Sequence, residues 1–204
     1  MRRGPVALVI ADLLEAAPFI KGLKLKKAAF GPFTVYKGKG LALVISGIGK
    51  SNAAMATAWA CTALSPRLLL NLGAAGSTDG KFQPGDCLQV ALAVEPERTH
   101  FRNGAPYEHR PATLKGFRCA VTATMDRAVL SGRDRKALAR MASLVEMECA
   151  AFIQACRKFD RRCYAFKLVT DSPGHTSGAD IVRNIKKYRD GFFSFFSSKI
   201  LPKL

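Results

Sequence analysis

Short, continuous apolar runs alternate along the chain with longer segments in which apolar residues recur every three or four positions. The first pattern is typical of buried strands and the second of helices with one apolar face. Strands are predicted at 5–10, 30–37, 40–45, 67–72, 87–94, 117–123 and 163–169, with a further strand end at 143–148. Helices are predicted at 11–23, 51–64, 131–141, 149–159 and from 179 onward. This alternation predicts one α/β domain over residues 1–204 with a mostly parallel sheet.

Two segments fit this pattern less simply. Residues 95–115 are polar and weakly periodic, so a loop that borders a site is expected there, with His100 and His109 on the surface. The apolar face of the last helix continues into Phe192, Phe193, Phe195 and Phe196. That face is expected to dock either to the core of the chain or to a partner subunit.

Composition narrows the class of protein. A chain of 204 residues with 49% hydrophobic residues suits a single globular domain. No apolar run approaches the roughly 20 residues that span a bilayer. The start resembles a signal peptide, but Asp12 interrupts its apolar run, so a first core strand is expected instead. The six cysteines form no CxxC pair. We therefore expect reduced core thiols in a cytoplasmic protein, and neither disulfides nor a metal site.

The net charge of +17 is the unusual feature of the composition. Attraction to nucleic acid or another polyanion is one interpretation, and general solubility is the other. The lysines and arginines are scattered, and no RNA-binding motif with interleaved aromatic residues accompanies them. Nucleic-acid binding is therefore disfavoured, although a salt-dependent titration with RNA would test it.

Two carboxylates two residues apart, Glu146 and Glu148, end the apolar run at 143–148. Side chains alternate along an extended segment, and the helix at 149–159 follows at once. One carboxylate accepts hydrogen bonds from two adjacent hydroxyl groups of a furanose, because each oxygen takes one bond. A solvated strand end is the alternative interpretation.

Other candidate ligand contacts also follow predicted strands. Glu15 lies in the first turn after the first strand, and sites gather at the carboxyl ends of parallel strands. A solvated glutamate that favours the helix dipole is the alternative there. The glycine turn at 46–50 has neither the spacing of a phosphate loop nor that of a dinucleotide fingerprint. What remains is that its backbone N–H groups stand at the start of a helix, where they can face a polar ligand. Small residues at 71–77 allow a flat ligand to approach the backbone.

Together, the stretches 42–50, 71–76 with 84–86, 145–148 and 170–171 resemble the nucleoside phosphorylase/nucleosidase superfamily over nearly the whole chain. Within it, the resemblance is closest to the methylthioadenosine/S-adenosylhomocysteine nucleosidases of purine and methionine salvage. It implies a three-layer α/β/α fold around a twisted mixed sheet. It also implies cleavage of the N-glycosidic bond of a purine nucleoside by a homodimer that needs no cofactor or metal.

The resemblance also implies roles for individual residues. Glu148 would bind the ribose hydroxyls, and Met147 would pack beside the sugar. Asp171 would be the general acid that protonates purine N7, so its surroundings are expected to raise its pKa. Glu15 would activate the attacking water. Further residues would line the pocket or lie along the base: Ile48, Gly73, Ala74, Gly76, Ala128 and Val129.

Hydrolysis is favoured over phosphorolysis. At the places where the phosphorylases hold phosphate, this chain has the uncharged residues Asn71 and Ala74. Asp12 and Glu15 also make the first loop negative, and a negative loop repels phosphate. Two departures from the nucleosidases leave alternatives open. Ala74 replaces their usual serine, and Lys167 replaces an arginine near the water. The segments 94–117 and 129–145 are also shorter than usual. A purine nucleoside phosphorylase and a catalytically weakened nucleoside-binding protein therefore remain alternatives, and the 5′ group of the nucleoside stays open.

Overall fold

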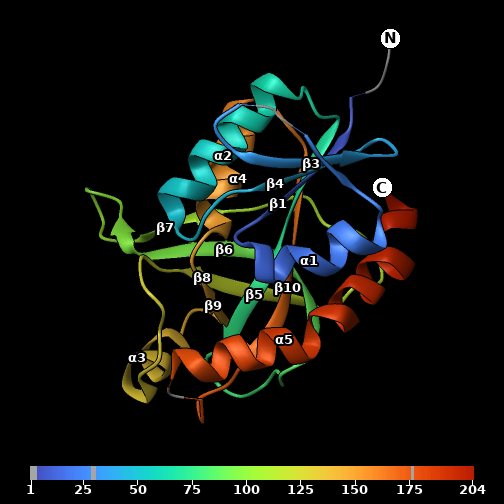
Figure 1. Ribbon diagram of the computed structural model, residues 1–204. Helices are drawn as coiled ribbons and strands as arrows, with labels where there is room; N and C mark the ends of the chain where they lie inside the picture. The colour runs from blue at the N-terminus through green and yellow to red at the C-terminus, as the bar shows by residue number, and fades with distance from the viewer. Residues whose placement is uncertain (1–3, 29–30, 176) are drawn as a thin grey trace.

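The computed structural model describes residues 4–28, 31–175 and 177–204 and shows a ten-stranded mixed sheet between two layers of helices (Figure 1). The strands are β1 (Val6–Ile10), β2 (Lys26–Ala28), β3 (Thr34–Gly38), β4 (Leu41–Ile45), β5 (Leu68–Ser77), β6 (Cys87–Thr99), β7 (Pro106–His109), β8 (Cys119–Thr124), β9 (Leu144–Glu146) and β10 (Cys163–Asp171). The α-helices are α1 (Leu13–Gly22), α2 (Lys50–Ala63), α3 (Gly132–Leu138), α4 (Cys149–Lys158) and α5 (Gly178–Phe195). The predicted three-layer α/β/α fold is confirmed.

The centre of the sheet is parallel. Strand β1 lies between β4 and β5, and β10 pairs with the other side of β5, all in the same direction. In register, Ile10 lies opposite Ile45, and Lys167 lies opposite Gly73. The carboxyl ends of the four strands therefore meet at one edge of the sheet, where the residues that follow them come together.

The sheet also closes on itself beside this edge. Strand β5 pairs with β10, β10 with β6, β6 with β8, β8 with β9, and β9 again with β5. The short strand β9 completes this ring, with Val145 opposite Gly76 and Glu146 opposite Thr124. The ring places the start of α4 directly beside the end of β5.

Alternation along β1 shows how the two faces of the sheet are buried. Ala7 and Val9 point to the apolar cluster under α2 and α4. Val6, Leu8 and Ile10 point to the cluster on the opposite face, under α1 and α5. Because both sets are buried, the strand reads as a continuous apolar run.

The phenylalanines at the carboxyl end of α5 pack on the core of the same chain. Phe192 and Phe196 are buried, and their rings lie 5.7 Å and 5.3 Å from that of Phe19 on α1. Phe193 and Phe195 are partly buried against the same cluster. Of the two expected roles, docking to the core is therefore the correct one.

The predicted loop at 95–115 is wrong in part. Strand β6 continues to Thr99 and pairs with β7, with Ala93 opposite His109. His109 is buried, and its Nε2 lies 2.8 Å from Glu95 Oε1, so its predicted surface position is also wrong. His100 is exposed, as predicted, and stacks on Tyr107. A buried partner carboxylate on a neighbouring strand explains the placement of His109, and the local sequence pattern does not show it.

Other boundaries differ from the prediction. Strand β2 was not expected, and residue 30, where the predicted hairpin begins, lies outside the described residues. Strands β5 and β10 run on through residues that were expected to form loops, to Ser77 and Asp171.

All six cysteines are free, but Cys119 is exposed and Cys87 is half-buried, so the prediction of core thiols fails for those two. None of the described helices is long and apolar enough to cross a membrane.

Removing the ring of Phe196 tests the packing of α5. Phe196→Ala empties a fully buried site beside Phe19 and is expected to lower the free energy of unfolding by about 3–5 kcal/mol in urea titration. Phe101→Ala is the matched control, because Phe101 is fully exposed and its loss should change that free energy by less than about 0.5 kcal/mol. Equal effects of the two changes would contradict this packing.

Candidate active site

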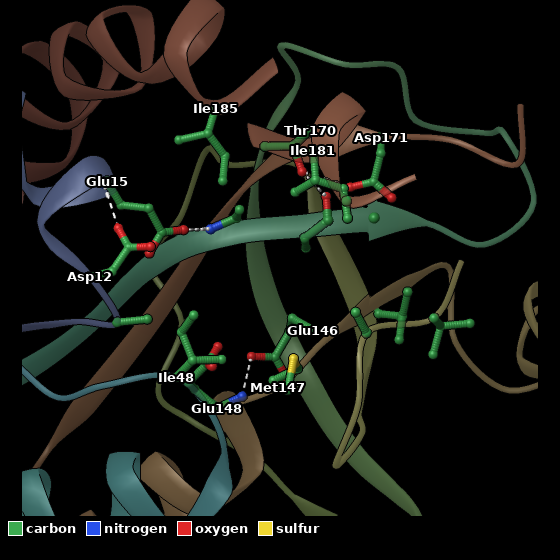
Figure 2. A pocket seen from close by; sticks show the side chains of 18 of the residues that line it. Asp12, Glu15, Ile48, Glu146, Met147, Glu148, Thr170, Asp171, Ile181 and Ile185 are labelled. Atoms are coloured by element: carbon green, nitrogen blue, oxygen red, sulfur yellow. Dashed lines mark hydrogen bonds between the residues drawn. The ribbon is translucent and has the colours of Figure 1, made fainter. Parts of the chain in front are cut away.

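A cavity of about 250 Å³ opens at the carboxyl edge of the parallel strands. Its walls come from the loops after β1 and β4, the ends of β5 and β10, the segment after β8, the β9–α4 junction and the start of α5. Figure 2 shows its acidic side chains on three sides: Asp12 and Glu15 on one, Glu146 and Glu148 on a second, and Asp171 on a third. The cavity therefore brings together acids that lie far apart in the sequence.

Most of the predicted site residues line this cavity. They are Glu15, Ile48, Ala74, Gly76, Ala128, Val129, Met147, Glu148 and Asp171. Two predicted residues do not line it. Gly73 lines a second cavity, of about 10 Å³, on the far side of Glu15, and Lys167 is buried behind the carboxylates. That smaller cavity is at the lower limit of the space that one water molecule needs.

Glu15 is held in the first turn of α1 by its own backbone and by β5. The Asp12 carboxylate caps the helix and accepts the backbone N–H of Glu15 at 2.9 Å. Ala74 donates its backbone N–H to Glu15 Oε1 at 2.7 Å, while Oε2 is buried with no hydrogen-bond partner among the described residues. Burial, and next the charge of Asp12, raise the pKa of Glu15 to about 7.

Glu148 stands immediately before α4. Its Oε1 accepts the backbone N–H of Gly49 at 2.8 Å, across from the glycine turn that starts α2. Gly49 has a φ of 98°, a conformation that suits glycine, and this turns its N–H toward the carboxylate. Burial raises the pKa of Glu148, and the charge of Lys167 and the N–H of Gly49 counter that effect. The glycine turn thus binds a carboxylate of the site.

Glu146 is the residue that fixes the β9–α4 junction, a role that was not predicted for it. Its Oε2 accepts the backbone N–H groups of Glu148 and Cys149, at 2.9 Å and 2.8 Å. Its Oε1 accepts the hydroxyl of Thr124 at 2.5 Å, and the same hydroxyl oxygen accepts the N–H of Ala150. The side chain therefore satisfies the free N–H groups at the start of α4 and orients Glu148.

Lys167 neutralises this buried acid. Its Nζ lies 2.9 Å from Glu146 Oε2, and both side chains are almost fully enclosed. Burial is the largest single influence and lowers the pKa of Lys167, but the surrounding acidic groups, with Glu146 foremost, together outweigh it, so the pKa lies above its ordinary value. A Cβ on Gly73 would lie 3.4 Å from Glu15 Oε1 and 3.7 Å from Lys167 Nζ. These are ordinary van der Waals distances, so the side chains of Glu15 and Lys167 both approach the backbone at Gly73.

Asp171 ends β10 with both carboxylate oxygens engaged. Oδ1 accepts the hydroxyl of Thr170 at 2.7 Å, and Oδ2 pairs with the guanidinium of Arg135. Arg135 is buried on α3 and also donates to the carbonyl of Ser77 at 2.8 Å. Asp171 is thus held at the edge of the cavity by one hydroxyl and one guanidinium.

Two of these partners could not be assigned from the sequence. In an extended segment Glu146 and Glu148, two positions apart, share one face, so the alternation at 143–148 does not distinguish their roles. Arg135 lies in a short basic helix that resembles a solvated surface, and no local signal distinguishes it from its neighbours. Among the described residues, no group of three or more His, Cys, Asp or Glu side chains has an arrangement that holds a metal ion.

Comparisons with known proteins identify the family of the chain. The sequence profile of the phosphorylase superfamily matches residues 5–195. The chain is 30% identical over 128 residues to a 5′-methylthioadenosine/S-adenosylhomocysteine nucleosidase of Staphylococcus carnosus. This match covers 61% of this chain and 50% of that protein. It is 28% identical over 103 residues to the enzyme of the same name from Buchnera aphidicola, covering 48% and 40%. The matches thus span half or less of these curated relatives.

Solved structures resemble the whole chain. A 5′-methylthioadenosine/S-adenosylhomocysteine nucleosidase from Helicobacter pylori, solved with butyl-thio-DADMe-Immucillin-A, superposes with a TM-score of 0.87 at 19% identity over 100% of both chains. A futalosine hydrolase mutant from the same species gives a TM-score of 0.86 at 18% identity, over 98% of this chain and 100% of that one. At sequence identities of 19% and 18%, this likeness shows a shared fold and nothing more.

The raised pKa of Glu15 predicts a dependence of stability on pH. Between its ordinary value of 4.5 and about 7, the folded protein binds this proton more tightly than the unfolded chain does. The free energy of unfolding of the wild type should therefore fall, relative to that of Glu15→Gln, as pH rises through this range, by at most about 1.4 kcal/mol per pH unit. Urea titrations at several pH values measure it.

Above pH 7 the difference between the two proteins should stay constant. Glu108→Gln is the control, because Glu108 is exposed on β7 and should give a curve parallel to that of the wild type. A Glu15→Gln curve that is also parallel between pH 4.5 and 7 would show that Glu15 has an ordinary pKa.

Proposed function

The chain belongs to the phosphorylase superfamily, and from that premise we propose that it hydrolyses the N-glycosidic bond of a purine nucleoside, a 5′-substituted adenosine. One observation carries the proposal: Glu15, Glu148 and Asp171 line a single cavity. Cleavage of this bond passes through a sugar with cationic character and a leaving base that gathers negative charge. Separate acids at the water, the sugar and the base suit that separation of charge.

Glu15 is the proposed base for the attacking water. A pKa of about 7 leaves a large fraction of its carboxylate ionised at neutral pH and close in basicity to the working pH, as a general base requires. The unpartnered Oε2 is the oxygen that is free to accept a proton. In the proposed step, the water oxygen bonds to C1′, its proton passes to Glu15, and the electron pair of the C1′–N9 bond leaves with the purine.

Glu148 is the proposed sugar ligand. Gly49 fixes one of its oxygens, and Glu146 holds its backbone, so the carboxylate is oriented before a ligand arrives. It would accept hydrogen bonds from the 2′- and 3′-hydroxyls, and its charge would stabilise the cationic sugar. Met147 lines the same wall and would pack against the furanose.

Asp171 is the proposed group through which a proton reaches N7. The proton comes from solvent, and the guanidinium of Arg135 stabilises the carboxylate that remains after transfer. Ala128 and Val129 line the cavity and are the proposed apolar contacts of the purine ring.

Hydrolysis fits the charges of the site better than phosphorolysis does. Asp12 and Glu15 lie on the wall where the nucleophile would enter, and two carboxylates repel a phosphate dianion. Arg127 also lines the cavity, but its guanidinium is paired with Asp134. Phosphorolysis is therefore the second candidate, and it requires a cation at the nucleophile that the described lining does not supply.

The names of the relatives support the choice of nucleoside. The curated relatives are 5′-methylthioadenosine/S-adenosylhomocysteine nucleosidases, and one structural neighbour is a futalosine hydrolase. We propose a 5′-methylthio or larger 5′-substituted adenosine, which would place the enzyme in purine and methionine salvage. Six free cysteines support a cytoplasmic location.

A release assay tests the activity. The wild type should release free adenine from 5′-methylthioadenosine. Asp171→Asn and Glu148→Gln should each lower kcat/KM by about 10²–10⁴-fold, because the first removes the proton donor of the base and the second removes the charge beside the sugar. Glu108→Gln, an exposed carboxylate on β7, is the matched control and should keep full activity. Adenine is measured by chromatography.

The same assay separates the alternatives. The sugar product should be free methylthioribose whether or not inorganic phosphate is present, whereas a sugar 1-phosphate would identify a phosphorylase. If the wild type binds 5′-methylthioadenosine in calorimetry but releases no adenine from this or other 5′-substituted adenosines, the chain is a nucleoside-binding protein, and the hydrolase proposal is wrong.

We further propose a homodimer that covers the mouth of the cavity. Leu13, Ile48 and Met55 are 52%, 55% and 55% exposed, on α1, the loop after β4 and α2, and Ile48 also lines the cavity. Large apolar side chains exposed beside a site are typical of an interaction surface. The phenylalanines of α5 do not contribute to this argument, because they pack on their own core.

Sedimentation velocity tests the dimer. The wild type should sediment as a dimer at micromolar concentration, and Met55→Glu should shift it to the monomer, because a buried charge opposes association. Met141→Glu, at an exposed apolar residue after α3, should leave the dimer intact. A monomeric wild type would contradict the proposal.

A further inference from the structure

The lysines and arginines of the chain are scattered along its sequence, but the fold gathers many of them at one edge of the sheet. This is the edge where the parallel strands begin, opposite the edge that holds the candidate active site. The segments that meet there are 22–26, 37–41, 64–68, 158–163 and 196–204. Together they contain ten lysines or arginines and one acid, Asp160. We call this surface the basic edge.

Backbone contacts place these segments side by side. The N–H of Arg67 donates to the carbonyl of Pro5 at 3.0 Å, just before β1 begins. Lys26 lies opposite Lys37 in the pair of β2 with β3, and Arg162 immediately precedes β10. In Figure 1 the basic edge lies on the side of the C-terminus, and α3 lies on the opposite side.

The basic edge is long. Six strands lie side by side along it, in the order β2, β3, β4, β1, β5 and β10. Neighbouring strands are about 4.8 Å apart, so the row extends over about 24 Å. Exposed cations stand along it: Lys26 on β2, Lys39 between β3 and β4, Arg67 before β5 and Arg162 before β10. Phosphates recur about every 3.4 Å along each strand of a nucleic-acid duplex, so the row matches about seven of them.

Part of the basic edge is hollow. A cavity of about 450 Å³ is lined by cations from three segments, Lys24, Lys39 and Arg67, and by Leu201 near the end of the chain. All three cations are exposed, and none of them forms an ion pair within the described residues. Like charges that converge without a counter-charge repel one another, and a bound anion removes this repulsion.

Helix dipoles explain only some of these cations. A lysine near the carboxyl end of a helix is favourable by itself, and this accounts for Lys158 after α4 and Lys24 after α1. Lys26, Arg67 and Arg162 stand at the starts of strands, where that reason does not apply. Their gathering therefore indicates an anionic partner.

The geometry favours a long polyanion over a single small anion or a membrane. The charge extends well past the hollow, from Lys26 to Arg162, and one phosphate cannot reach both. A membrane surface requires exposed apolar side chains beside the cations. Among the large apolar side chains that are exposed in the described residues, Phe159 is the one that lies in these segments. A lone aromatic residue also makes a poor stacking platform for a single strand.

We propose that the basic edge binds the phosphate backbone of a nucleic-acid duplex, independently of base sequence. The helices α1, α2 and α4 reach this edge with their carboxyl ends, so they present no helix face to a groove. Contacts to phosphates position a duplex without reading its bases. The carboxylates that line the candidate active site lie at the other end of the strands, so this surface is separate from that site.

Fluorescence anisotropy with labelled RNA and DNA duplexes of about 20 base pairs tests the proposal. The wild type should bind both, with an affinity that falls at least about 100-fold between about 50 and 200 mM salt. Lys39→Glu combined with Arg67→Glu should weaken binding at least about tenfold at about 100 mM salt, because two phosphate contacts are lost. The matched control is Arg133→Glu combined with Lys136→Glu, which changes the net charge equally at exposed positions of α3. It should stay within about threefold of the wild type, because its charges are screened from the basic edge.

Thermal unfolding shows that both double variants are folded. Equal losses of affinity in the two double variants would overturn the proposal, because net charge alone would then act. Absence of binding at about 50 mM salt would also overturn it. So would tighter binding to phosphatidylserine vesicles than to the duplexes, or displacement of a duplex by stoichiometric inorganic phosphate. If Lys39→Glu with Arg67→Glu does not fold, Lys26→Glu with Arg162→Glu replaces it, with the same expected loss.

Discussion

The site depends on the buried ion pair between Glu146 and Lys167. One oxygen of Glu146 meets Lys167 and the free N–H groups at the start of α4, and the other meets Thr124 at the end of β8. Three elements of the closed sheet are thereby joined at a single carboxylate. A charge of this kind is stable inside a protein only when its partners are all in place, so the geometry of the junction is sharply defined. The position of Glu148 follows from it.

The fold supplies what this pair needs. Parallel strands bring β1, β4, β5 and β10 to one edge, and the antiparallel contact of β9 with β5 closes the ring beside them. Gly76 stands where a side chain from strand β10, Asp171, and one from helix α3, Arg135, approach the same backbone. The result is a cavity whose acids differ in environment: burial raises the pKa of Glu15, whereas Asp171 is paired with the guanidinium of Arg135. Two carboxylates in different environments can take different chemical roles.

The sequence predicted the parts of the site that follow directly from strand ends. Glu15, Glu148 and Asp171 come after apolar runs, and parallel strands place such residues together, so their meeting in one cavity was predictable. The partners of these acids were not. Arg135 and His109 look like surface residues locally, and their burial depends on pairings between β5 and β9 and between β6 and β7 that local periodicity does not encode. Lys167 was placed near the water by resemblance alone, and the direction of its side chain depends on Glu146.

In the proposed function, a single nucleoside occupies the space between the three acids. A crystal structure of Asp171→Asn with 5′-methylthioadenosine would show where it binds. We expect the ribose hydroxyls on Glu148, C1′ facing Glu15 and the purine beside residue 171. A nucleoside bound elsewhere, or turned so that its base lies against Glu148, would contradict it.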